Sequence, residues 1–347
     1  MKSSKIVVAH VHTNWNFCAL LLYISKVKTR RLIIVLENPN ISIVKYLQKS
    51  ITDLKVEIID AGSHWGKLLC LSKVRNRSTI KNDTTYVKFT NFSHFGQVLQ
   101  KFGRFNEVVF IDDGTTFLNI LDDTIEYTKG WRKILKKLFW PSGFEPRFDC
   151  FRGVDVAYIN HLGLIKTEVG SFALKCEDFF VLFSIQKLKE AVEVYFELDQ
   201  QVSHWLDLLD SHDTLVLGSS LAEHGFVSFA DYEKVLCQVD EKISTKTIYK
   251  PHPGETKMSS ILSAPNWTYD RLSDVPVEIF FCYGMPKNLI SLGSTTSFLF
   301  TPNDLNMKNY VFLLENLICD RTFLKLTHQN FVGTKFKRIS TNVGKPI

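Results

Sequence analysis

Short runs of branched apolar residues alternate with helical stretches along the first half of the chain. The predicted strands cover residues 6–9, 32–36, 56–59 and 107–111. The predicted helices cover residues 17–27 and 93–102, with a further helix from Ile41 that Asn40 would cap. Repeated strand, helix, strand order is typical of a parallel sheet covered by helices. The chain is therefore expected to have an α/β fold.

A second series of strands begins after a long acidic stretch, residues 188–209, that is predicted to be one helix. The predicted strands of this second series cover residues 214–218, 247–249, 277–281 and 289–292. A chain of 347 residues is long enough for two domains of ordinary size. We therefore expect two Rossmann-like domains, residues 1–200 and residues 201–347.

Three polar motifs stand at the ends of predicted strands, where open α/β sheets bind their ligands. They are Ile111-Asp112-Asp113-Gly114, Tyr249-Lys250-Pro251-His252-Pro253 and Gly293-Ser294-Thr295-Thr296-Ser297. Together they supply a carboxylate, an imidazole and a cluster of hydroxyls. This set suits the transfer of a group away from a phosphate.

The first motif places Asp112 and Asp113 directly after a buried strand. A carboxylate in this position can act as a general base toward a hydroxyl group. Gly114 allows the backbone to turn tightly or to approach a ligand. The alternative is that one aspartate caps a helix that begins there.

The second motif holds His252 between Pro251 and Pro253, which restrict the backbone on both sides. An imidazole fixed in this way can donate a hydrogen bond or a proton to a leaving phosphate. Lys250 adds positive charge, although the strand can direct its side chain elsewhere. The alternative is a histidine in a rigid turn.

The third motif contains Ser294, Thr295 and Thr296 after a strand. Hydroxyls and free N–H groups at the start of a helix can cradle a phosphate. A hydroxyl-rich helix cap without a ligand is the alternative. Gly218 and Ser219 follow another strand, and they either border the nucleotide or form a structural turn.

No Asp-x-Asp triplet occurs in the chain, although many nucleotide-sugar transferases hold a divalent metal with it. No metal and no cofactor are therefore expected, and protein donors would stabilise the leaving phosphate. The seven scattered cysteines include no Cys-x-x-Cys pair, which indicates a reducing compartment. No basic arm or aromatic signature for binding nucleic acid is present.

Residues 129–140 would form a basic amphipathic helix with aromatic ends. Such a helix can lie in a membrane interface, or it can be a surface helix packed on the core. No apolar run is long enough to span a bilayer, and no signal peptide precedes the first strand. The expected location is the cytoplasm, with possible peripheral contact to the inner face of the membrane.

The order of the motifs Asp112-Asp113-Gly114, His252-Pro253 and Ser294-Thr295-Thr296 resembles the bacterial sialyltransferases of glycosyltransferase families 38, 52 and 80. Residues 216–236 are similar to a stretch before the His-Pro motif of the polysialyltransferase and lipooligosaccharide sialyltransferase families. The two threonines stand where these families often carry serine.

The resemblance implies a GT-B fold with the active site between two Rossmann-like domains. It implies CMP-sialic acid as the donor, a glycan hydroxyl as the acceptor, and inversion at the anomeric carbon. Asp112 would be the general base, supported by Asp113, and His252 would bind or protonate the departing phosphate. The phosphate would be held by Ser294, Thr295 and Thr296.

The resemblance also assigns the acceptor to the N-terminal domain, where His12, Asn14, Asp113 and Gly114 would lie on the acceptor side. The C-terminal domain would bind the nucleotide. One alternative keeps this fold and uses another CMP-activated ulosonic acid, such as Kdo, legionaminic acid or pseudaminic acid. A different alternative is a non-catalytic scaffold at the membrane.

Overall fold

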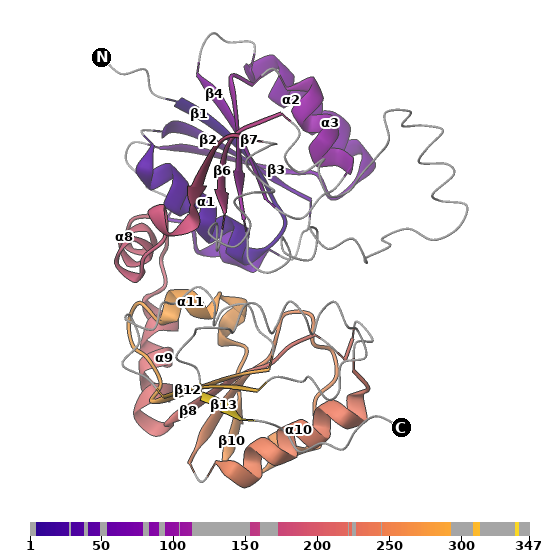
Figure 1. Cartoon of the computed structure of the whole chain (residues 1–347). Coiled ribbons are helices and arrows are strands. Elements are labelled where there is room, and N and C mark those ends of the chain that lie inside the picture. Colours follow the sequence, from indigo (N-terminus) through magenta and orange to yellow (C-terminus); the bar gives the residue numbers. More distant parts are fainter. Residues whose placement is uncertain are drawn as a thin grey trace, which may run out of the picture. The chain divides into compact units, whose positions relative to one another are not determined.

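The computed structural model describes residues 5–27, 29–37, 41–48, 54–78, 83–89, 94–103, 105–112, 153–159, 173–220, 222–223, 227–243, 245–292, 308–312 and 337–339. The chain divides into two compact units, unit 1 (Met1–Glu197) and unit 2 (Leu198–Ile347). Each unit is built around its own sheet (Figure 1). The boundary predicted from the sequence is residue 200.

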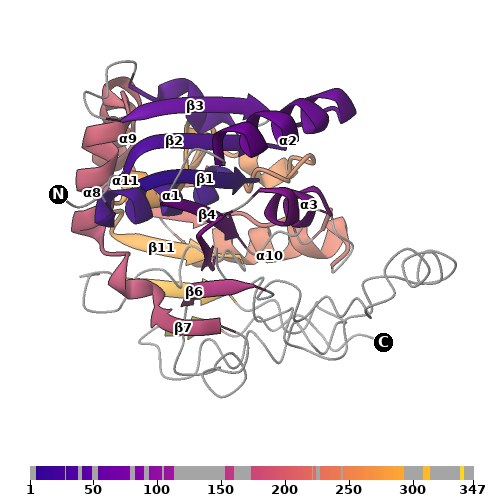
Figure 2. The same ribbon diagram turned by 90° about the horizontal axis from the view of Figure 1, so that it is seen from above.

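Unit 1 contains a seven-stranded parallel sheet with the strand order β3-β2-β1-β4-β5-β6-β7. Its strands are β1 (Lys5–Val11), β2 (Thr29–Leu36), β3 (Lys55–Asp60), β4 (Thr84–Phe89), β5 (Glu107–Ile111), β6 (Val154–Ile159) and β7 (Ala173–Asp178). Figure 2 shows β3, β2, β1 and β4 side by side in this order. Because all the strands are parallel, their carboxyl ends share one edge of the sheet.

The described helices of unit 1 are α1 (Asn14–Lys26), α2 (His64–Ser78), α3 (His94–Phe102) and α8 (Ile185–Tyr195), with the short 3₁₀ turns η1 (Ser42–Tyr46) and η2 (Phe179–Val181). Thr13 and Asn16 form a capping box that begins α1 directly after β1. Helices α2 and α3 bury Cys70 and Leu99 against one face of the sheet. Strand β1 contributes Ile6 and Val8 to the same cluster, so His10 and His12, at alternate positions further along, are on that side.

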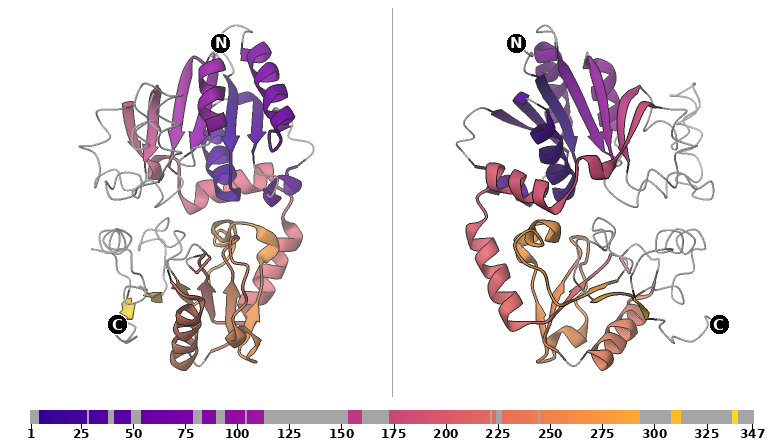
Figure 3. Two further views of the ribbon diagram at one scale, coloured as in Figure 1. Left: turned by 90° about the vertical axis from the view of Figure 1, so that its right-hand side faces the viewer. Right: turned by 60° about the vertical axis from the view of Figure 1, so that its left-hand side comes forward.

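Unit 2 contains a six-stranded sheet with the order β10-β9-β8-β11-β12-β13, again parallel throughout. Its strands are β8 (Thr214–Leu217), β9 (Thr247–Lys250), β10 (Trp267–Tyr269), β11 (Asn288–Ser291), β12 (Lys308–Phe312) and β13 (Lys337–Ile339). The described helices are α9 (Asp199–Ser211), α10 (Phe229–Lys242) and α11 (Val277–Phe280), with the 3₁₀ turns η3 (Ser260–Ser263) and η4 (Leu272–Asp274). Figure 3 shows the strands of both sheets from two further sides.

Helix α10 packs on one face of this second sheet. Its Tyr232, Val235 and Val239 lie in a buried cluster with Val216 of β8 and Tyr249 of β9. Ser228 caps the helix by accepting a hydrogen bond from the N–H of Asp231. The fold class predicted from the sequence, an α/β protein with two Rossmann-like sheets, is confirmed.

The predicted helix over residues 188–209 is wrong as a single element, because the chain breaks between α8 and α9. Phe196 is extended, with φ −124° and ψ 151°, and forms an antiparallel bridge with Leu47. Burial of Phe196 and Leu198 therefore interrupts a stretch whose local pattern is helical. The break falls at the junction of the two units.

The predicted strand over residues 277–281 is also wrong, because Val277–Phe280 is the short helix α11. All four residues are buried, and Phe280 and Phe281 pack against Trp205 of α9. A short apolar run does not distinguish a buried helix from a buried strand.

Helix α2 and strands β4, β6 and β7 of unit 1 were not predicted. The end of α2 and the start of β4 fall in the polar stretch 75–85, which carries little apolar signal. Residues 107–111 therefore form the fifth strand of the sheet and not the fourth. Among the described residues, no helix combines the length and the apolar character needed to span a bilayer.

Candidate active site

The carboxyl ends of β8, β9 and β11 lie next to one another in unit 2. Leu217 of β8 is in register with Lys250 of β9 and with Ser291 of β11. The N–H of Gly218 donates to the carbonyl of Lys250 at 2.9 Å, and the N–H of Leu292 donates to the carbonyl of Leu217 at 3.0 Å. The described parts of these three strands thus end at neighbouring positions, at Leu217, Lys250 and Ser291. Ser294, Thr295 and Thr296 lie outside the described residues.

His252 is exposed in the loop that follows β9. Its Nδ1 accepts a hydrogen bond from the N–H of Gly254 at 3.0 Å, so the neutral ring carries its proton on Nε2. The backbone N–H of His252 donates to Oε2 of Glu255. The loop geometry therefore presents Nε2–H as a donor group at the edge of the sheet.

Glu255 holds this loop from inside unit 2, and nothing in the sequence pattern indicated its role. Its Oε1 accepts hydrogen bonds from Tyr249 at 2.6 Å and from Tyr232 at 3.0 Å. The Tyr232 hydroxyl also accepts from the N–H of Ser219 at 3.1 Å. Burial raises the pKa of the Glu255 carboxyl, although these donors act against the rise. The network joins the loop after β8 to the loop after β9.

Gly218 is required for this network. A Cβ at this position would be 2.3 Å from Oε2 of Glu255 and 2.4 Å from the Tyr249 hydroxyl. The neighbouring Ser219 is buried, and its Oγ has no hydrogen-bond partner in the described part of the structure. Buried polar groups usually have a hydrogen-bond partner, so this hydroxyl is an exception in the loop after β8.

Lys250 is buried, on the opposite side of β9 from Tyr249. Burial lowers the pKa of its ammonium group, and the nearby Glu278 and Asp274 act in the opposite direction. Pro253 is exposed beside His252.

The turn η4, which follows β10, has an unusual backbone. Leu272, Ser273 and Asp274 all have positive φ, at 48°, 53° and 58°. A left-handed conformation costs a residue with a side chain about 1–2 kcal/mol. The N–H of Leu272 donates to Oδ1 of Asp270 at 2.6 Å, which ties the start of the turn. The sequence gives no signal of this strain, because the turn contains no glycine or asparagine.

In unit 1, Asp112 directly follows β5 and is only 1% exposed. Its N–H donates to the carbonyl of Tyr158 at 2.9 Å, so Asp112 continues the pairing of β5 with β6. Asp113 and Gly114 lie outside the described residues, as does the stretch 129–140. The sequence-predicted base thus lies at the carboxyl edge of the first sheet.

Two other predicted residues lie near the end of β1. His12 follows the strand, and Asn14 begins α1. Strand β4 lies between β1 and β5, and neighbouring strands are about 4.8 Å apart. The backbones of His12 and Asp112 are therefore roughly 10 Å apart across the sheet. Asn14 donates to Ser42 at 3.1 Å and accepts from the N–H of Ile43 at 3.2 Å, which fastens η1 to the start of α1.

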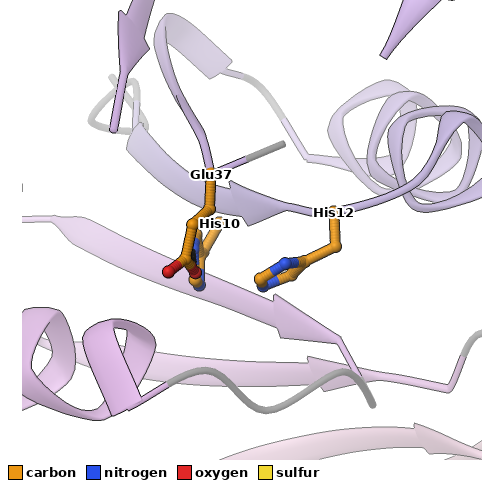
Figure 4. A group of neighbouring side chains, drawn as sticks. All are labelled: His10, His12 and Glu37. Atoms are coloured by element: carbon orange, nitrogen blue, oxygen red, sulfur yellow. Dashed lines mark ion pairs between the residues drawn. The ribbon is translucent and has the colours of Figure 1, made fainter. Parts of the chain in front are cut away.

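His12 belongs to a group of side chains that sequence reasoning did not bring together (Figure 4). Nε2 of His10 lies 3.2 Å from Oε2 of Glu37, and Lys67 donates to Oε1 of Glu37 at 2.6 Å. The rings of His10 and His12 meet edge to face, with centroids 4.2 Å apart. Burial, as the largest cause, together with the positive charges of His10 and Lys67 lowers the pKa of His12 to about 4, while Glu37 acts against them.

The whole chain was compared with known proteins. No protein-family model matches it, and no curated protein is significantly similar to it in sequence. Solved structures do match. An α/β-galactoside α-2,3-sialyltransferase from the luminous marine bacterium Photobacterium phosphoreum is similar with a TM-score of 0.56 at 12% identity, over 97% of this chain and 99% of that one.

Enzymes that use uridine nucleotides are similar as well. UGT89C1 of Arabidopsis thaliana, solved with UDP-L-rhamnose, matches with a TM-score of 0.58 at 8% identity, over 98% of this chain and 86% of that one. The UDP-GlcNAc 2-epimerase of Methanocaldococcus jannaschii matches with a TM-score of 0.51 at 8% identity, over 96% of this chain and 89% of that one. The fold is therefore GT-B, with two Rossmann-like domains, as the sequence resemblance implied.

Proposed function

We propose that this protein is a glycosyltransferase, and more particularly a metal-independent, inverting sialyltransferase. It transfers sialic acid from CMP-sialic acid to a hydroxyl of a bacterial surface glycan, such as lipooligosaccharide or capsule. The observation that carries the proposal is in unit 2, where β8, β9 and β11 end in register with one another and His252 Nδ1 accepts a hydrogen bond from the N–H of Gly254, which leaves Nε2–H of a neutral ring as the donor. The GT-B fold and the order of the sequence motifs support it.

In this reaction the acceptor oxygen attacks the anomeric carbon of sialic acid while the bond from that carbon to the phosphate oxygen breaks. Asp112 accepts the proton of the acceptor hydroxyl. The electron pair of the broken bond leaves with CMP, and His252 donates a hydrogen bond or a proton to the departing phosphate. A single displacement of this kind inverts the anomeric centre.

Unit 2 binds the nucleotide in this proposal. The phosphate is held by Ser294, Thr295 and Thr296, and Gly218, Ser219 and Pro253 line the same edge of the sheet. The hydroxyl of Ser219 is buried and has no partner among the described residues, so a contact with the donor requires a local rearrangement of this loop. Lys250 is buried, so it contributes positive charge from within the unit and not by direct contact.

Unit 1 binds the acceptor in this proposal. His12 and Asn14 lie near the end of β1 and Asp112 near the end of β5, while Asp113 and Gly114 continue the chain beyond it. The stretch 129–140 makes peripheral contact with the inner face of the membrane, where lipid-linked acceptors are assembled.

The decisive experiment supplies CMP-sialic acid and a panel of glycan acceptors in buffer that contains EDTA. Transfer of sialic acid, or slow release of CMP from the donor alone, is the expected result. Absence of both reactions across a broad panel contradicts the proposal. Nuclear magnetic resonance of the product then establishes whether the anomeric centre is inverted.

A second candidate donor is a UDP-sugar, because one of the similar structures is a complex with UDP-L-rhamnose and another is a UDP-GlcNAc 2-epimerase. Competition of CMP, CDP, UDP and GDP against donor release separates these classes. Tight binding of CMP favours the sialyltransferase or a transferase of another CMP-activated ulosonic acid. A stronger effect of UDP favours the second candidate.

A further inference from the structure

The carboxyl ends of β1 and β2 bring together three side chains, two imidazoles and one carboxylate, of types that can bind a metal ion. His10 and His12 are two residues apart on β1 and its extension, so they share one side of the sheet. Val11 is in register with Leu36, which sets His12 beside Glu37. Figure 4 shows the His12 ring turned toward His10 and the Glu37 carboxylate.

The distances within this group fit a small divalent cation. One potential ligand atom from each of the three residues lies within 4.8 Å of the other two. Nitrogen and oxygen ligands at about 2.0–2.1 Å from a tetrahedral zinc ion are about 3.3 Å apart. The separation of 3.2 Å between Nε2 of His10 and Oε2 of Glu37 matches this value. The other separations, at most 4.8 Å, would have to shorten by no more than about 1.5 Å to complete the set.

Each imidazole has a buried Nε2 that makes no well-formed hydrogen bond in the described part of the structure. Nε2 of His10 has only the 3.2 Å approach to the Glu37 carboxylate, and Nε2 of His12 has no partner there. His10 itself is only 3% exposed. Burying such atoms without a partner is unfavourable, and a bound cation would satisfy both.

Neighbouring residues hold the ligands in place. Lys67 binds Oε1 of Glu37 and so directs the other carboxylate oxygen toward His10. Phe95 packs edge-on against the His10 ring, with centroids 5.8 Å apart. Gly96 leaves room for that ring, since a Cβ there would lie 2.7 Å from Nδ1 of His10. The positive charge of Lys67 opposes a cation, so only moderate affinity is expected.

We propose that His10, His12 and Glu37 form a binding site for one zinc-like divalent cation. Two imidazoles and one carboxylate suit Zn²⁺ and Co²⁺, whereas Mg²⁺ prefers oxygen ligands alone. Three protein ligands leave a fourth position for water or for a hydroxyl of a bound molecule. This site is additional to the proposed transfer reaction, which needs no metal and is assayed in EDTA.

The test uses the full chain without a histidine tag, stripped with EDTA and then freed of the chelator. Titration with Zn²⁺ against a chromogenic chelator should show one bound ion per chain. His12→Gln and Glu37→Gln should each weaken binding at least about tenfold. The matched control is His204→Gln, which removes an exposed histidine of unit 2 and should leave binding unchanged.

Cobalt gives an independent reading, because tetrahedral Co²⁺ absorbs visible light much more strongly than octahedral Co²⁺. The unaltered chain and the His204→Gln control should show the tetrahedral spectrum. His12→Gln and Glu37→Gln should lose it. Circular dichroism establishes that each variant is folded. Absence of a bound ion in the unaltered chain overturns the proposal, as does unaltered affinity in both ligand variants. Either outcome leaves the result of the EDTA transfer assay untouched.

Discussion

The carboxylate of Glu255 accepts a hydrogen bond from the backbone N–H of His252, three residues earlier in the same loop. Its other oxygen is bound by Tyr249 and Tyr232, whose positions are set by β9 and α10. The orientation of an exposed histidine thus depends on a buried carboxylate, and Glu255 is a positioning residue for His252.

Glu255→Gln should reduce the rate of sialic acid transfer about tenfold, because a small displacement of a reacting group is costly. The amide keeps one accepting oxygen, but its NH₂ group then faces either the N–H of His252 or the two tyrosine hydroxyls, all of which donate to Glu255. The KM for the donor should change less than kcat. A variant with unaltered kcat would show that the carboxylate does not position His252.

Gly218→Ala should lower the free energy of unfolding by about 1–3 kcal/mol, since the added methyl overlaps Glu255 and Tyr249. Urea denaturation measures the loss. The control is Gly254→Ala in the neighbouring loop, where the nearest atom to the new Cβ would be 3.2 Å away and belongs to a side chain. Equal losses in the two variants would contradict the close packing inferred at Gly218.

His252→Ala and Asp112→Asn should each reduce turnover about 100-fold or more, if the first assists the leaving phosphate and the second accepts the acceptor proton. Rates of transfer at saturating donor measure the effect. His204→Ala removes another exposed histidine of unit 2, which pairs with Asp270, and its rate should stay near normal. Near-normal turnover in either of the first two variants would refute its assigned role.

Ser273→Gly should raise the free energy of unfolding by up to about 1 kcal/mol, because glycine adopts the left-handed conformation without steric cost. Ser273 is exposed and has a φ of 53°, so the change relieves strain and loses little contact. Ser263→Gly, at an exposed serine in the right-handed turn η3, should be destabilising instead. Ser273→Gly should therefore melt at a higher temperature than Ser263→Gly. A lower melting temperature for Ser273→Gly would exclude strain at Ser273.

The low pKa of His12, about 4 in the folded chain against 6.5 in an unfolded one, makes stability depend on pH. Between these values the unfolded chain binds the extra proton, so the contribution of His12 to stability falls as pH falls from about 6.5 toward 4. The loss between about pH 7.5 and pH 5 is at most about 2 kcal/mol. Urea unfolding in EDTA at both pH values measures it, and His12→Gln should show a smaller pH dependence. If the unaltered chain and His12→Gln lose the same stability between the two pH values, His12 is protonated as readily in the folded chain as in the unfolded one.

Sequence pattern was sufficient for the elements whose signal is local. The run Val108–Ile111 before Asp112 predicts a buried strand with a carboxylate at its end, and β5 confirms it. The same reasoning failed for Val277–Phe280, where apolar residues fill a helix turn against Trp205. It also failed at Phe196, where pairing with Leu47 overrides a helical pattern. In both failures a contact distant in the chain decided the local conformation.

The sequence by itself determined the alternation of strands and helices, and it placed His252 and Asp112 at strand ends, because hydrophobic periodicity and proline act locally. Only the tertiary structure decided that Glu255 holds the His252 loop and that His10, His12 and Glu37 meet. Those contacts depend on the register of neighbouring parallel strands, which is set by packing between residues far apart in the chain. No spacing within one segment of the sequence carries that information.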